Sequence, residues 1–276
     1  MLFPAPEPAP AHAPAPCFIV KTLEALTIDD EASFRHVGLY ADLKRALQDD
    51  GYRFRVLPET HAGRWDRAVA LNLTFWGADD GGDVLVDSHI PADVVAHVAW
   101  HHLTARALGT KSGERASADV LFLGESIASA FDVYLVGRLL GHAPQSSFLE
   151  SQVPAMADAA AEAGLDEEAF EALLAGIAAD PDRAFDDLRA LLFDAARALV
   201  GCKDAEEALA VLSGLDSHRF GPILHRYELS NWVLYARAYA TAVPDTRVQA
   251  VDRALREGNG LEWLTREWID PPRATT

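Results

Sequence analysis

The sequence has few cysteines, and they form no metal-binding pattern. Cys17 and Cys202 are the two cysteines among 276 residues, and they lie far apart in the chain. Zinc sites made from cysteine need closely spaced pairs, and small disulfide-stabilised secreted folds are rich in cysteine. We therefore expect free thiols and a cytoplasmic protein.

Basic residues and long apolar runs are also scarce. The chain has 24 Lys and Arg residues against 42 Asp and Glu residues, which gives a net charge of −18. Such a surface repels phosphate backbones and anionic bilayers, so neither a nucleic acid nor a membrane is an expected partner. No run of about 18 uninterrupted apolar residues predicts a membrane-spanning helix. Glycine-rich phosphate loops and nucleophile elbows are absent too.

The composition divides the chain into three parts. Residues 1–16 alternate proline and alanine without a basic or apolar segment, which is typical of a disordered leader rather than a secretory signal. Residues 17–150 mix short strand-like segments with helices. Residues 151–276 are rich in Ala, Leu, Asp and Glu with helical periodicity, so they predict a helical portion packed on the preceding part.

The pattern along the chain predicts an α+β fold, in which a small sheet precedes a mostly helical second half. Strands are expected at Cys17–Glu24, Tyr52–Leu57, Arg67–Trp76 and Val84–Asp87. Helices are expected at Glu31–Asp50, Ile90–Gly109, Ala118–Leu140, Pro154–Ala163, Asp166–Ala179, Pro181–Val200 and Asp204–Leu212. The segments Arg247–Glu257 and Leu261–Trp268 close the helical half.

The helix expected near Pro91 to Gly109 carries two histidines on one face. His97 and His101 are four residues apart, and that spacing places both rings on the same side of a helix. The remaining positions are apolar in almost every direction, which is typical of a buried helix. Two imidazoles on a buried helix need partners, and a metal ion is one way to supply them.

The next apolar helix contributes acidic side chains. Glu125 and Asp132 are seven residues apart and share a face, with Ser129 between them. Burying an ionised carboxylate is unfavourable unless it is paired or bound to a cation. These carboxylates therefore predict a polar or metal-binding site between the two helices.

Together these features resemble the glutamate-zincin (gluzincin) branch of the metallopeptidases. In that family a His-Glu-x-x-His helix is completed by a glutamate on a later helix. His97 and His101 in HVAWH, followed by Glu125 in GESIASAFD, match this order. The resemblance covers roughly residues 67–141 and implies one zinc ion held by these three residues. It also implies that Asp132 or Ser129 supports a ligand histidine by a hydrogen bond to its other ring nitrogen.

One residue departs from the zincin motif. Val98 stands where the family has the glutamate that activates water. Loss of a general base lowers a rate by about 10²–10⁴-fold. Glu114, His102 or a residue of the helical half could take its place, and nothing in the sequence selects among them. The expected protein is thus a metal binder that, if active, is a divergent hydrolase of a peptide or small molecule.

Two alternatives stay open from the sequence. Two histidines and one carboxylate also describe a non-heme iron site, because imidazole suits iron and zinc alike. The other alternative is a metal-free scaffold in which Glu125 pairs with a histidine and the helical half binds a protein partner. A different helical site would involve His225 and Glu228, which are three residues apart.

Overall fold

The computed structural model describes residues 18–59, 83–109, 115–241 and 244–270. The expected leader at 1–16 and the strand expected at Arg67–Trp76 lie outside these residues. The chain forms two compact units. The first contains Met1–Thr27 and Gly51–Ile90, and the second contains Ile28–Asp50 and Pro91–Thr276.

The first unit is built on a three-stranded sheet with the strand order β1-β3-β4. β1 (Ile19–Thr22) pairs antiparallel with β3 (Arg53–Val56), and Ile19 lies opposite Val56. β4 (Val84–Leu85) runs parallel to β3. The alternating sequence of β3 places Phe54 and Val56 in the core, as a period of two requires. All three strands fall within expected segments and are shorter than those segments.

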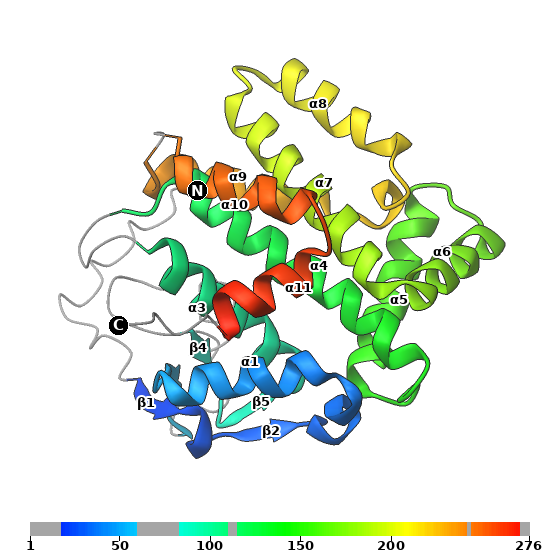
Figure 1. The fold of residues 1–276 in the computed structure, drawn as a ribbon. Coiled ribbons are helices and arrows are strands. Elements are labelled where there is room, and N and C mark those ends of the chain that lie inside the picture. Colours follow the sequence, from blue (N-terminus) through cyan, green and yellow to red (C-terminus); the bar gives the residue numbers. More distant parts are fainter. Residues whose placement is uncertain (1–17, 60–82, 110–114, 242–243, 271–276) are drawn as a thin grey trace, which may run out of the picture. The chain divides into compact units, whose positions relative to one another are not determined.

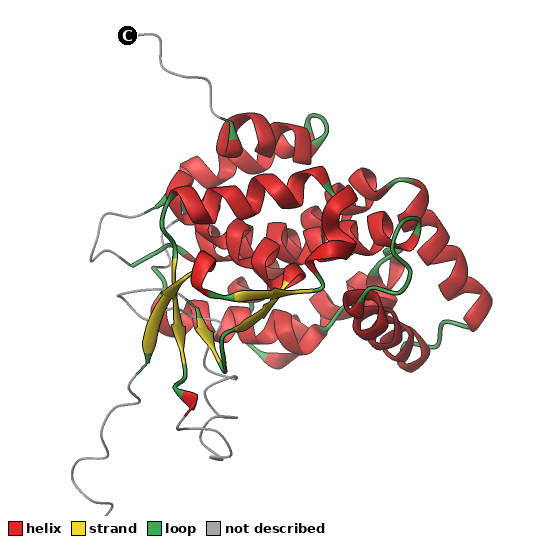
Figure 2. Ribbon diagram, turned by 90° about the horizontal axis from the view of Figure 1, so that it is seen from below, coloured by secondary structure: helices red, strands yellow, loops and turns green. Residues whose placement is uncertain are grey.

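A separate two-stranded sheet consists of β2 (Thr27–Asp29) and β5 (His89–Pro91). Figure 2 shows how small the strand content is beside the helices. The prediction of an α+β fold with small sheets before a mostly helical remainder is confirmed.

The second unit is helical, and its segments follow the apolar periodicity of the sequence (Figure 1). Among the described residues its α-helices are α1 (Gly38–Asp49), α3 (Ala92–Leu108), α4 (Ala118–Leu140), α5 (Ser147–Glu162), α6 (Glu167–Ala179), α7 (Pro181–Gly201), α8 (Ala205–Gly214), α9 (Arg226–Tyr239), α10 (Thr246–Arg256) and α11 (Gly260–Leu264). A short π-helix, η6 (Thr265–Ile269), continues α11.

Helix α4 is the central element of this unit. It packs against α3, α6 and α7, and its apolar residues face these neighbours on several sides. Ser117 caps its start by accepting a hydrogen bond from the amide of Val120. By length and composition alone α4 could cross a membrane, but 83% of its most apolar window is buried inside the fold. That burial is typical of a core helix.

Helix α5 begins earlier than the sequence predicts. Proline is favoured in the first turn of a helix, so the pattern predicts a start at Pro154. Instead Pro154 lies inside α5, and the helix starts at Ser147. Ser146 supplies the cap, because its hydroxyl accepts a hydrogen bond from the amide of Leu149 at 3.2 Å. The predicted start is wrong because the local cap outweighs the proline signal.

Candidate metal centre

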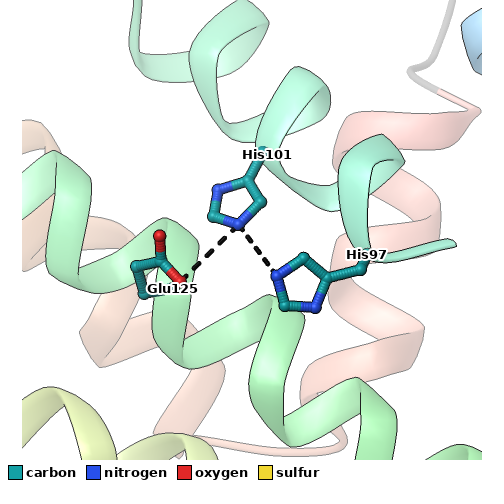
Figure 3. Close-up of side chains that lie close together, drawn as sticks. All are labelled: His97, His101 and Glu125. Atoms are coloured by element: carbon teal, nitrogen blue, oxygen red, sulfur yellow. Dashed lines mark hydrogen bonds and ion pairs between the residues drawn. The ribbon is translucent and has the colours of Figure 1, made fainter. Parts of the chain in front are cut away.

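Helix α3 brings two imidazole rings together. His97 and His101 project from the same face, and their Nε2 atoms are 3.2 Å apart (Figure 3). The helix begins directly after Pro91 and carries Asp93 in its first turn. Gly109 follows its last residue. The expected helix is therefore confirmed, and it starts one residue after the predicted proline.

Helix α4 adds the carboxylate. Glu125 Oε2 lies 3.7 Å from His101 Nε2, and only 6% of the Glu125 side chain is exposed. The ligand atoms of His97, His101 and Glu125 all lie within 4.8 Å of one another. These residues are 24 or more positions apart between the helices, so the packing of α3 on α4 produces the cluster.

The spacing suits a metal ion. Two ligand atoms at about 2.0–2.2 Å from a tetrahedral zinc ion lie roughly 3.3–3.6 Å apart. The separations of 3.2 Å and 3.7 Å fall close to that interval. The donor set, two ring nitrogens and a carboxylate oxygen, is one that zinc and iron both accept. The histidine side chains remain 21% and 33% exposed, so the cluster is open on the histidine side.

Asp132 contacts the outer ring nitrogen of His97. Its Oδ2 lies 3.1 Å from His97 Nδ1, which is the ring nitrogen opposite the cluster. When Nδ1 donates a hydrogen to this carboxylate, the lone pair of Nε2 points toward His101 and Glu125. Among the described residues no hydrogen bond joins Ser129 to the cluster. The support of a ligand histidine by either residue stays a prediction.

The electrostatics favour a neutral imidazole at His101. Burial of the ring and the neighbouring charge of His97 lower the pKa of His101 to about 3. A neutral imidazole is the form that binds a metal.

Helix α3 also carries an acidic neighbour of the cluster, Asp93, which the sequence analysis did not identify as part of the site. Burial and then the charge of Asp132 raise the pKa of Asp93 to about 6. In the sequence, only the position of Asp93 one turn before His97 indicates that it lies near the cluster.

Neither of the two residues named above as a substitute for the missing general base is placed at the cluster by the described part of the structure. Val98 is buried, with 5% of its surface exposed. His102 points to Asp50 instead, at 2.7 Å from Nε2 to Oδ2. Glu114 lies outside the described residues.

The described residues do not assemble the alternative helical site. His225 occupies the N-cap position of α9 without a side-chain capping bond, and Glu228 lies on the first turn of that helix as an exposed residue. Within the described part of the chain, the group of His97, His101 and Glu125 is the one cluster of three or more His, Cys, Asp or Glu residues with metal-ligand spacing.

Comparisons with known proteins identify no relative of this chain. No protein-family profile, no curated protein sequence and no solved structure matches the chain. The resemblance to gluzincins therefore depends on the His-x-x-x-His helix and the glutamate of the next helix. What stands is an α+β fold that carries a candidate metal site of two histidines and one glutamate.

Proposed function

We propose that this protein binds one divalent metal ion through His97, His101 and Glu125, and that the ion is zinc. The observation that supports the proposal is the meeting of two Nε2 atoms and one carboxylate oxygen at a partly open site. Three protein ligands leave coordination positions open, as in catalytic zinc sites. A zinc ion bound there supplies a Lewis acid that polarises an oxygen atom of a substrate.

The chain's own residues have distinct parts in this proposal. Glu125 brings the negative charge that offsets part of the charge of the ion. His101 remains neutral at physiological pH because its pKa is about 3. Asp132 orients His97 and raises the basicity of its ring. Hydrolysis of a peptide or small molecule is the reaction class that such a site serves, and Val98 limits its rate.

Elemental analysis of protein purified without chelators tests the proposal. We expect about one zinc per chain in the wild type, as a single site requires. The metal should be lost in the variants His97→Ala and Glu125→Gln. His225→Ala is the matched control, because it removes an exposed imidazole far from α3 in sequence and should retain the metal.

Two other results would change the conclusion. Iron in place of zinc, lost in the same variants, would identify a non-heme iron protein with the same ligands. Absence of any metal after incubation with zinc or ferrous iron, with unchanged folding of the variants, would contradict the proposal. That result would support the metal-free scaffold.

A further inference from the structure

A buried hydroxyl beside the cluster has no hydrogen-bond partner among the described residues. Thr104 lies on α3 with 3% of its surface exposed. Its Oγ1 atom makes no hydrogen bond with any described residue. Buried polar atoms are almost always hydrogen-bonded, and each exception needs an explanation. In helices a threonine hydroxyl commonly bonds to the carbonyl three or four residues earlier, and Thr104 does not.

Thr104 and the ring of His101 lie on the same side of α3. They are three residues apart, which makes them neighbours on a helix. Both face Gly124 of α4. A Cβ atom at Gly124 would lie 3.4 Å from Thr104 Cγ2 and 3.5 Å from His101 Nδ1. The missing side chain of Gly124 thus leaves the threonine and the imidazole edge facing the same small space.

The two histidines of the cluster differ at their outer nitrogen. His97 Nδ1 lies against Asp132. His101 has its Nε2 directed to His97 and Glu125, and its Nδ1 finds no hydrogen-bond partner among the residues described. A metal-bound histidine almost always donates its second ring N–H to an oxygen atom. His101 therefore lacks the acceptor that a ligand histidine requires.

We propose that the Thr104 hydroxyl is this acceptor and that Thr104 is the positioning residue of His101 in the metal-bound protein. The inference rests on the proposed metal site. Threonine in helices uses two χ1 rotamers, and a rotation of about 120° about the Cα–Cβ bond of Thr104 brings Oγ1 to the place that Cγ2 occupies. That rotation moves the hydroxyl to the position that now faces Gly124 beside His101 Nδ1. There it accepts the Nδ1 hydrogen, directly or through one water molecule.

Two substitutions separate positioning from packing. Thr104→Val keeps the shape and removes the hydroxyl, whereas Thr104→Ser keeps the hydroxyl. We expect zinc affinity, measured by competition with a chromophoric chelator, to fall about 10–100-fold in the valine variant. The serine variant should stay within about threefold of the wild type.

The metal-free protein gives the second measurement. Because the hydroxyl has no partner there, Thr104→Val should leave the unfolding temperature of the metal-free protein unchanged or raise it. Thr265→Val is the matched control, since the Thr265 hydroxyl donates to Leu261 O at 2.7 Å. We expect that control to lower the unfolding temperature and leave zinc affinity unchanged. Zinc should also protect the His101 Nδ1 hydrogen from exchange in nuclear magnetic resonance spectra, except in Thr104→Val.

The outcomes distinguish the two proposals. If the wild type binds zinc and Thr104→Val binds it equally well, the role of Thr104 is wrong and the metal site stands. Destabilisation of the metal-free valine variant, with zinc affinity unchanged, would likewise show a packing role. A wild type that takes up no zinc overturns both proposals.

Discussion

Asp132 is the residue whose contact with the cluster is best defined. Its carboxylate lies 3.1 Å from His97 Nδ1, the ring nitrogen opposite the cluster. We expect Asp132→Asn to weaken zinc binding about tenfold, because the amide oxygen still accepts the hydrogen bond but lacks the charge. Asp132→Ala should weaken binding up to about 100-fold. Chelator competition measures both variants, with the exposed Asp158→Asn as control. Equal affinity in all of them would contradict a supporting role for Asp132.

Val98 occupies the position at which the zincin motif has the glutamate that activates water. It is buried on α3 directly after the first histidine. In metal-loaded protein, Val98→Glu should raise peptide hydrolysis by about 10²-fold or more, since a positioned general base contributes that much. Val98→Gln is the control, because it has the same shape without a basic carboxylate. Hydrolysis of quenched fluorescent peptides is the measurement. If folded, metal-loaded Val98→Glu is no faster than Val98→Gln, the analogy with peptidases fails.

The candidate ligands were predictable from the sequence, and their surroundings were not. His97 and His101 follow from helical periodicity, and Glu125 follows because a carboxylate in an apolar helix needs a partner. By contrast, the raised pKa of Asp93 and the unpartnered hydroxyl of Thr104 depend on which side chains of α4 pack against α3. Such neighbours come from tertiary packing, which periodicity along one helix does not encode.

Among whole elements, α4 was predicted at the right residues and α5 was not. The 23 residues of α4 are mostly apolar, begin after a serine cap and end before Gly141. The apolar pattern, the serine cap and the glycine therefore all predict the same helix bounds. In α5 the proline signal and the serine cap conflict, and the sequence alone does not say which one prevails. Strand ends were also predicted too long, because pairing with a neighbour, rather than alternation, determines where a strand stops.

The packing of α4 on its neighbours depends on a glycine. A Cβ atom at Gly137 would lie 2.7 Å from Ile177 O and 3.0 Å from Pro181 Cγ. Backbone of α6 cannot move away cheaply, so Gly137→Ala should destabilise the protein by about 1–3 kcal/mol. This is the expected net effect, because the steric clash outweighs the gain of about 1 kcal/mol that alanine brings as a better helix former than glycine.

Gly176→Ala is the matched control for this element. Gly176 lies inside α6, and within the described part of the chain no atom outside this helix and its adjoining residues lies within 4 Å of its Cβ position. We therefore expect this alanine to stabilise the protein by up to about 1 kcal/mol. Urea denaturation compares the two variants. A Gly137→Ala protein that is as stable as Gly176→Ala would show that α4 and α6 do not pack as closely as described.

For the whole molecule, the surplus of acidic residues is the dominant electrostatic feature. The net charge is −18, and α7 alone places Asp182, Asp186 and Asp187 close together. Asp186 is partly buried and accepts a hydrogen bond from the amide of Gly260 at 3.0 Å. Burial, together with the charges of its two acidic neighbours, raises the pKa of Asp186 to about 6.

This raised pKa determines the direction of a pH effect. In the unfolded chain the carboxyl group titrates near 3.8 and in the folded protein near 6. The folded state therefore binds more protons between these values, so the contribution of Asp186 to stability increases as the pH falls from 7 to about 4. Asp186→Asn imitates the protonated form and keeps the acceptor for Gly260. We expect it to raise the free energy of unfolding by about 1–2 kcal/mol at pH 7, after allowance for solvent exposure.

A second substitution separates this local effect from the general charge surplus. Asp187→Asn removes the same charge from the same turn of α7, but Asp187 pairs with Arg219 at 2.7 Å. We expect Asp187→Asn to leave stability unchanged or lower it slightly, because an exposed ion pair contributes about 0–1 kcal/mol. Urea denaturation at pH 7 and at pH 4 provides the comparison. The gain of Asp186→Asn should shrink toward zero at pH 4, where Asp186 is protonated in the folded protein. Equal gains for both variants at pH 7 would show that net charge, rather than the burial of Asp186, controls the acid response.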